Sequence, residues 1–223
     1  TPGISVTILY PSGKVSDIQE KQLTTLGGNV QALEIDGTFD DCQRLVKQAF
    51  LDEELRGTFN LASANSINIA RLIPQSFYYF AAYAALRKQG NQKPVVFVVP
   101  SGNFGNLSAG LMAYQMGLPV QGFVAACNDN HPVPDYLSSG KYEPSASVET
   151  ISNAMDVGDP SNFVRIMEIF QQQFANLTAK VSSCSVTDDV TKATLLEVFN
   201  KHQYLCDPHG AVAYRALEDY LKL

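Results

Sequence analysis

The segment Ser101-Gly102-Asn103-Phe104-Gly105-Asn106, called the glycine loop below, carries the clearest chemical signal in the sequence. It follows the apolar run Val95–Val99 and leads into residues with apolar side chains at helical spacing. A strand that enters a glycine turn and then a helix points backbone N–H groups and the positive end of the helix dipole at one place. Phosphate suits this geometry best, although a tight turn that needs its glycines for steric reasons alone also fits.

The glycine loop matches neither of two common phosphate-binding motifs. It lacks the Gly-Lys-Ser/Thr of the P-loop, and glycines at positions 102, 105 and 110 miss the G-x-G-x-x-G spacing of dinucleotide-binding proteins. The loop also contains no charged residue. We therefore expect a neutral phosphate site, which suits a cofactor whose own ring performs the chemistry.

A second group of polar residues, Ser63-Ala64-Asn65-Ser66-Ile67-Asn68, lies at an expected helix start and is called the polar cluster below. Serine and asparagine are ordinary helix caps, but the cluster holds more of them than one cap needs. Arg71 follows in the first turns, where a planar guanidinium can reach an anion. A surface ion pair explains Arg71 equally well.

Other polar residues give weaker signals. The run Asn128–His131 follows an expected strand, where open α/β sheets place ligand contacts, but a turn rich in Asn and Asp needs no function to explain it. We expect His202 and His209 to be structural. No cluster of His, Cys or Asp has the spacing of a metal site, so no metal is expected.

Composition limits the class of protein. With 45% apolar and 17% charged residues among 223, the chain is expected to fold around a core. Its net charge of −6 comes from dispersed acids, which disfavours nucleic acid as a partner. No run approaches the roughly 18 apolar residues of a membrane span. The cysteines show no CxxC pattern, and we expect them to be reduced in a cytosolic protein.

The expected elements alternate between strand and helix, which predicts an α/β fold with open parallel sheets and crossover helices. Strands are predicted at 4–9, 30–35, 58–62, 95–99, 120–127 and 180–186. Helices are predicted from a Ser16–Gln19 capping box, from Thr38, over 105–116, 163–174 and 188–202, and after Asp207-Pro208.

Two segments have less regular predictions. The run from Asn65 or Ser66 to Gly90 is predicted to be one long helix, bent at Pro74. Residues 128–160 are polar and show little periodicity, which indicates a functional loop or a lid.

Four segments in this order resemble the bacterial-type threonine synthase family: "LASANSINIARLIPQSFYYFAAYAAL", "VPSGNFGNLSAGLMAYQMGLPV", "SNAMDVGDPSNF" and "DPHGAVAYRAL". The resemblance extends over essentially the whole chain. It implies the fold of the tryptophan synthase β subunit, with residues 1–85 in a smaller domain and residues 86–223 in a larger one. It also implies pyridoxal 5′-phosphate (PLP) as the cofactor.

The resemblance further implies the roles of single residues. In that family the glycine loop holds the PLP phosphate, which assigns cofactor binding to Ser101, Gly102, Asn103, Phe104, Gly105 and Asn106. Asn65 or Asn68 approaches the phenolic oxygen of the cofactor. The substrate's phosphate faces a further set of residues, namely Ser63, Ser66, Asn68, Arg71 and Asn103.

The implied reaction converts O-phospho-L-homoserine and water to L-threonine and phosphate, a carbon–oxygen lyase step. The family's "FKD"-like segment with the lysine that binds PLP covalently, its "GDTG"-like loop and its "TAHP"-like segment do not occur in residues 1–223. We therefore expect an internal fragment, inactive alone and prone to self-association. A different PLP-dependent β- or γ-elimination and a non-catalytic phosphate-binding module are the alternatives.

Overall fold

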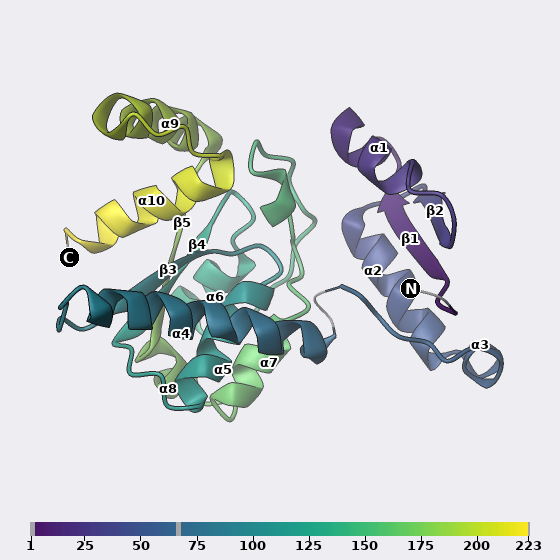
Figure 1. Cartoon of the computed structure of the whole chain (residues 1–223), viewed down its shortest axis with the longest axis horizontal. Coiled ribbons are helices and arrows are strands. Elements are labelled where there is room, and N and C mark those ends of the chain that lie inside the picture. The colour runs from purple at the N-terminus through teal and green to yellow at the C-terminus, as the bar shows by residue number, and fades with distance from the viewer. Residues whose placement is uncertain (1–2, 66–67, 223) are drawn as a thin grey trace. The chain divides into compact units, whose positions relative to one another are not determined.

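The computed structural model describes residues 3–65 and 68–222. The chain forms two compact units, residues 1–62 and 63–223 (Figure 1). The boundary comes before the polar cluster, so the helix that follows the cluster belongs to the second unit. The predicted division of the complete protein after residue 85 is a separate matter and stays a prediction.

The first unit contains the predicted parallel strand pair. β1 (Val6–Pro11) and β2 (Val30–Ile35) pair side by side, and α1 (Asp17–Thr24) connects them. The helix begins with the predicted capping box, in which the N–H of Gln19 donates to the hydroxyl oxygen of Ser16. This strand–helix–strand order is the connection that parallel strands require.

The end of the first unit differs from its prediction. α2 (Phe39–Leu51) begins after the predicted N-cap at Thr38, but α3 (Glu53–Thr58) precedes the segment predicted as a strand at 58–62. That prediction was wrong. The sheet of this unit contains β1 and β2 alone among the described residues, so the segment 59–62 pairs with no strand. The N–H of Phe59 instead donates to the carbonyl of Leu55 and closes the end of α3.

The cap of α2 makes a testable prediction about acid titration. Asp41 accepts hydrogen bonds from Arg44 and from the N–H and hydroxyl of Thr38, which lower its pKa to about 2. Because the folded pKa is depressed, this stabilisation is present above the unfolded value of 3.8 and is lost as the pH falls through about 2. Carboxyl ¹³C NMR should show this, and Arg44→Gln should raise the pKa. A wild-type pKa near 3.8 contradicts the prediction.

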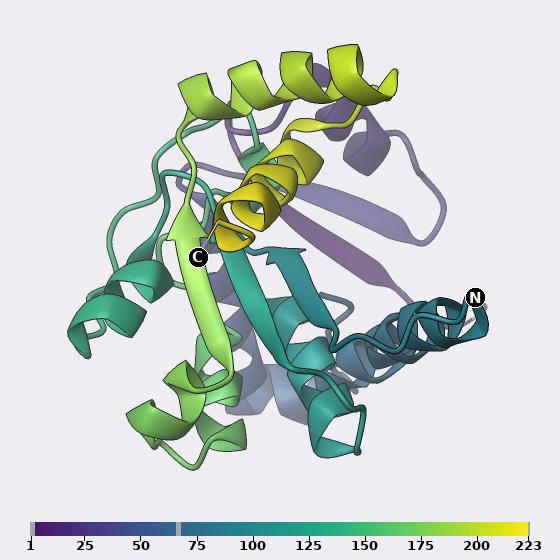
Figure 2. The ribbon, with the colours of Figure 1, turned by 90° about the vertical axis from the view of Figure 1, so that its left-hand side faces the viewer.

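The second unit is built on a three-stranded parallel sheet, as predicted. The strand order is β3 (Val96–Pro100), β4 (Gly122–Cys127), β5 (Val181–Ser185). α5 (Gly105–Gln115) connects β3 to β4. α10 (Pro208–Tyr220) packs on β3 and β4, with α9 (Asp188–His202) beside it (Figure 2). Each predicted strand of this unit is confirmed, with small differences at the ends.

Both faces of this sheet are buried. Phe123, Ala125 and Cys127 of β4 belong to a core with α4 (Leu72–Lys88), α5 and α7 (Phe163–Ile169). Val124 and Ala126 belong to a second core that includes α10. This alternation follows from the period of two residues in a strand. Two-sided burial explains why the strand sequence is apolar without interruption.

The predicted long helix begins later than expected. A single 3₁₀ turn, η1 (Ile69–Arg71), precedes α4 (Leu72–Lys88). Pro74 is the third residue of α4, where its missing N–H removes no helical hydrogen bond. The proline therefore lies in the first turn of a helix instead of bending the middle of one.

The polar stretch 128–160 is more ordered than predicted. It contains α6 (Pro132–Ser139) and a 3₁₀ turn, η2 (Asn153–Met155). The single helix predicted over 163–174 is two short helices, α7 (Phe163–Ile169) and α8 (Phe174–Thr178). The break lies at Gln171 and Gln172, whose φ angles of 54° and 58° are incompatible with a right-handed helix.

In residues 3–65 and 68–222, no helix is both long and apolar enough to span a membrane. The same ranges contain no group of three or more His, Cys, Asp and Glu side chains placed to hold a metal ion. The four cysteines are free thiols.

Candidate phosphate-binding site

The glycine loop joins the end of β3 to the first turn of α5. Ser101 extends the sheet pairing, because its N–H donates to the carbonyl of Ala126 at 2.8 Å. Its hydroxyl donates to the carbonyl of Val99 at 2.9 Å. α5 begins at Gly105 with no side-chain cap and no acidic residue in its first turn. Because the N–H groups of a first turn have no acceptor within the helix, they are suited to an anion.

Phe104 holds the turn in an uncommon backbone conformation. It is the N-cap of α5, with φ 59° and ψ 15° in the left-handed region that residues other than glycine rarely adopt. Its side chain is 3% exposed, and its ring contacts that of Phe163 edge to face. We attribute the persistence of this strained turn to the burial of the ring.

Asn103 ties the glycine loop to residues far along the chain. Its side-chain oxygen accepts hydrogen bonds from the N–H of Ser161 at 2.7 Å and from the Ser161 hydroxyl at 2.9 Å. Its carbonyl accepts from the amide of the buried Asn162 at 3.0 Å. Neither Ser161 nor Asn162 was predicted to be part of the site, and their place in the segment "SNAMDVGDPSNF" is the signal that points to them.

Asn106 is held from α4. The hydroxyl of Tyr79 donates to the carbonyl of Asn106 at 3.0 Å and also to the Asn106 side-chain oxygen. Burial raises the pKa of Tyr79, so the phenol stays protonated and remains a donor. A Cβ on Gly110 would lie 2.5 Å from the Tyr79 ring, which shows how closely α4 approaches α5.

Gly102 is the point at which another segment touches the glycine loop. A Cβ at this position would lie 2.5 Å from the Cα of Met155 in η2, a distance that real Cβ atoms essentially never show. The contact is between two backbones, so no side-chain movement can relieve it. Gly102 is therefore required for close packing, in addition to any role in ligand binding.

Hydrogen bonds join the described residues of the polar cluster, 63–65 and 68, to one another. The hydroxyl of Ser63 donates to the side-chain oxygen of Asn65 at 2.8 Å, and the amide of Asn68 donates to the carbonyl of Ser63 at 2.7 Å. Asn68 also caps η1 by accepting from the N–H of Ala70. These contacts bring three of the predicted ligands together in one turn.

Arg71 folds back on the same turn. Its Nη1 donates to the carbonyl of Ala64 at 2.7 Å, and the side chain is exposed. A guanidinium carries five N–H donors, so this bond orients the group without using all of them. α4 links the two predicted clusters, because Arg71 immediately precedes it and its Tyr79 contacts Asn106. Ser66, also predicted as a ligand, lies outside the described residues.

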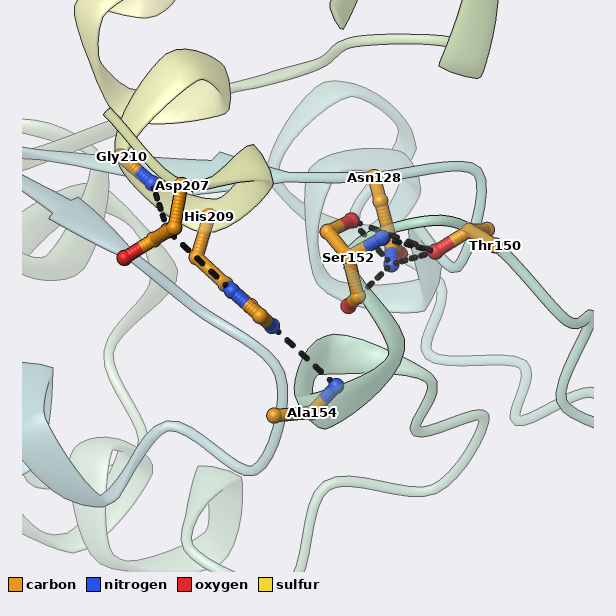
Figure 3. Close-up of polar contacts among 7 residues, drawn as sticks. All are labelled: Asn128, Thr150, Ser152, Ala154, Asp207, His209 and Gly210. Atoms are coloured by element: carbon orange, nitrogen blue, oxygen red, sulfur yellow. Dashed lines mark hydrogen bonds and ion pairs between the residues drawn. The ribbon is translucent and has the colours of Figure 1, made fainter. Parts of the chain in front are cut away.

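The run Asn128–His131 contributes to a buried network after β4. The carboxylate of Asp156 accepts four hydrogen bonds, from the amides of Asn128 and Asn130 and from the N–H and hydroxyl of Thr150. Burial raises the pKa of Asp156, and those hydrogen bonds lower it in part. Asn128, which is 1% exposed, also contacts Ser152 (Figure 3). The network therefore fixes the segment that leads into η2.

Removing the side-chain amide of Asn128 from this network should destabilise the folded chain. We expect Asn128→Leu to lower the free energy of unfolding by about 2–4 kcal/mol, because Thr150, Ser152 and the partly buried Asp156 each lose a partner. Urea unfolding measures the effect. The exposed Asn200→Leu variant is the matched control and should change stability by about 0.5 kcal/mol or less. Equal effects of the two substitutions contradict a structural role for the network.

Residues 2–223 match the family model described as "Pyridoxal-phosphate dependent enzyme". Over 98% of the chain, the sequence is 50% identical to threonine synthase from Serratia marcescens. Threonine synthase from Escherichia coli is also 50% identical, over 99% of the chain. The chain spans 50% and 51% of these two proteins, about half their length.

Solved structures show the same similarity to threonine synthases. The crystal structure of threonine synthase from Escherichia coli superimposes on 98% of the chain with a TM-score of 0.91 and 50% identity, and the chain covers 50% of that protein. PLP-bound threonine synthase from Brucella melitensis matches 96% of the chain with a TM-score of 0.81 and 38% identity, and 51% of that protein is covered. These matches confirm the predicted fold and the resemblance to threonine synthases, and the family model places the chain in the pyridoxal-phosphate dependent enzyme family.

Proposed function

We propose that the protein to which this chain belongs is a threonine synthase, which converts O-phospho-L-homoserine and water to L-threonine and phosphate. The observation that carries the proposal is 50% identity to threonine synthases over nearly the whole chain. The four motifs of the resemblance lie in different elements, so the similarity is not limited to one cofactor-binding loop. The free cysteines support the cytoplasmic location that we also propose.

The glycine loop fits the phosphate of PLP. Its donors are backbone N–H groups at an uncapped helix start, with no acidic side chain in the first turn to compete for them. We assign the phosphate to residues 101–106, and Asn103, Phe104 and Asn106 hold the loop through Ser161, Phe163 and Tyr79. When bound, PLP supplies an electron sink for carbanion chemistry at the substrate.

The polar cluster fits the substrate's phosphate. Arg71 is already oriented by Ala64 and adds the cationic group that the glycine loop lacks. We assign Ser63, Ser66 and Asn68 to the same phosphate and Asn65 to the phenolic oxygen of PLP. We also assign Asn103 to the substrate's phosphate, and its side-chain oxygen accepts hydrogen bonds from Ser161.

The proposal that the covalent lysine lies outside residues 1–223 rests on the lack of an "FKD"-like segment in the sequence and gives a spectroscopic prediction. Mixed with PLP, this chain should bind the cofactor but should not show the absorbance band at roughly 410 nm that marks a covalent lysine–PLP adduct. Borohydride treatment followed by mass spectrometry checks this result. A stable reduced adduct at one specific lysine contradicts it and places the covalent anchor within residues 1–223.

The function is tested on the complete protein. Incubation with O-phospho-L-homoserine should release phosphate and L-threonine in equal amounts, whereas O-phosphoserine and cystathionine should give no comparable turnover. Turnover of phosphoserine or cystathionine alone supports a different elimination enzyme. Binding of PLP without turnover of any of the three substrates supports a non-catalytic module.

A further inference from the structure

His209, in the first turn of α10, contacts the segment that supports the glycine loop. The N–H of Ala154 in η2 donates to Nε2 of His209 at 3.2 Å (Figure 3). The other ring nitrogen, Nδ1, lies 3.3 Å from Oδ1 of Asp207, which also accepts from the N–H of Gly210 at 2.8 Å. Asp207, His209 and Ala154 thus form a continuous chain of polar contacts across 55 residues of sequence.

The direction of these bonds determines the state of the imidazole. A backbone N–H donates, so Nε2 of His209 must be an acceptor, and the ring is neutral with its proton on Nδ1. That proton is donated to Asp207. Hydrogen bonding from Gly210 lowers the pKa of Asp207, so its carboxylate remains an acceptor for the ring. The N-cap of α10 therefore sets the tautomer of His209.

The segment held by His209 is the one on which the glycine loop rests. Met155 follows Ala154 directly, and its backbone is the surface that a Cβ on Gly102 would strike. The Met155 side chain is 4% exposed and packs in a core with Val212 of α10. A displacement of η2 is therefore transmitted to Gly102 by direct contact between two backbones.

Polar contacts from several elements hold η2 and the residues before it in the described part of the chain, among them the carboxylate of Asp188 in α9, which accepts from the N–H of Ile151. Asn128, after β4, contacts Ser152 just before η2, and His209 contacts Ala154 inside it (Figure 3). The Asn128 side is buried, whereas Ala154 is exposed. The His209 bond is thus a polar contact between the exposed side of the turn and α10.

We propose that His209 is a positioning residue for the glycine loop, acting through η2 to hold the Gly102 backbone in place. The effect that we expect on phosphate affinity rests on the proposed function of the loop. The effect of His209 on the position of the Gly102 backbone does not. In this proposal the first turn of α10 supports the glycine loop, and the atom of His209 that provides the support is Nε2, which accepts from Ala154, and not Nδ1.

Two isosteric substitutions separate the ring nitrogens. In His209→Gln the side-chain amide occupies the position of Nε2 and can accept from Ala154. In His209→Asn the amide occupies the position of Nδ1, keeps a donor toward Asp207 and leaves Ala154 without its acceptor. We expect amide hydrogen exchange of Ala154 to be about fivefold faster in His209→Asn and close to wild type in His209→Gln.

NMR of the ¹⁵N-labelled full chain reads the effect without ligand. The proposal predicts an acceptor-type ¹⁵N shift for Nε2 in the wild type, and displaced amide signals of Met155 and Gly102 in His209→Asn that return toward wild type in His209→Gln. Unchanged Gly102 signals in His209→Asn, or equal effects of both variants, overturn it.

A parallel titration with PLP should show affinity about fivefold lower in His209→Asn only. If the wild type does not bind PLP, the proposed function is contradicted. The His209 proposal is then decided by the NMR signals measured without ligand.

Discussion

Replacing Gly102 by alanine is expected to lower the stability of the chain by about 2–3 kcal/mol and to weaken PLP binding about tenfold or more. The added Cβ meets the Cα of Met155 at 2.5 Å, and neither backbone can move aside by a rotamer change. The loop must shift, so we expect at least one of the hydrogen bonds that we assign to the phosphate to be lost. Urea unfolding measures the first effect, and isothermal titration with PLP measures the second.

Gly210→Ala is the matched control for this substitution. Gly210 lies in the first turn of α10, where an added Cβ meets its nearest neighbours at 3.7 Å, an ordinary contact. Because alanine is the better helix former, stability should stay the same or rise by up to about 1 kcal/mol. PLP affinity should be unchanged. Comparable losses in the two variants contradict a specific role for the Gly102–Met155 contact.

The second large effect is expected at Arg71 in the complete protein. Arg71→Gln removes the cationic fork assigned to the substrate's phosphate, so kcat/KM for O-phospho-L-homoserine should fall about 30-fold or more, the loss expected for hydrogen bonds to a charged group. Arg71→Lys keeps the charge but not the planar fork and should recover part of the loss. Affinity for PLP should be unchanged in both variants, because we assign the cofactor's phosphate to the glycine loop and not to Arg71.

Arg87→Gln is the control on the same helix. Arg87 lies in the last turn of α4, where its guanidinium donates to the carbonyl of Asn91. Its substitution should leave kcat/KM close to wild type. An Arg71→Gln enzyme with normal kcat/KM contradicts the assignment of Arg71 to the substrate.

Local signals in the sequence predicted most elements of the fold. The Ser16–Gln19 capping box, the N-cap at Thr38 and the Asp207-Pro208 pair each mark a helix start that the structure confirms. α9 has the predicted bounds Asp188–His202. These signals succeed because caps and buried strands are stabilised by contacts within a few residues of sequence.

The errors occur where distant contacts decide the local structure. Phe59 is extended, but it lacks a neighbouring strand in the described part of its unit. Residues 128–160 are polar and aperiodic because a buried network around Asp156 orders them, and such a network has no sequence period. The helix predicted over 163–174 breaks at Gln171, which carries no sequence mark for positive φ.

The candidate site was predicted where its residues are adjacent in sequence and was missed where they are distant. The glycine loop is recognisable because strand, glycines and helix are adjacent in sequence. The support of the loop comes from Ser161 for Asn103 and from Met155 for Gly102, across more than 50 residues. Those pairings depend on how η2 and α7 pack, so residue types and spacing alone did not predict them.

Phosphate binding by the backbone of the glycine loop is tested most directly by a ¹H–¹⁵N NMR titration of the chain with PLP and, in parallel, with pyridoxal. The two ligands differ only in the phosphate. Saturable shifts of the amides of Gly102 to Leu107 with PLP, and none of comparable size with pyridoxal, are the predicted result. Equal shifts with both ligands, or shifts confined to residues outside 101–107, contradict it.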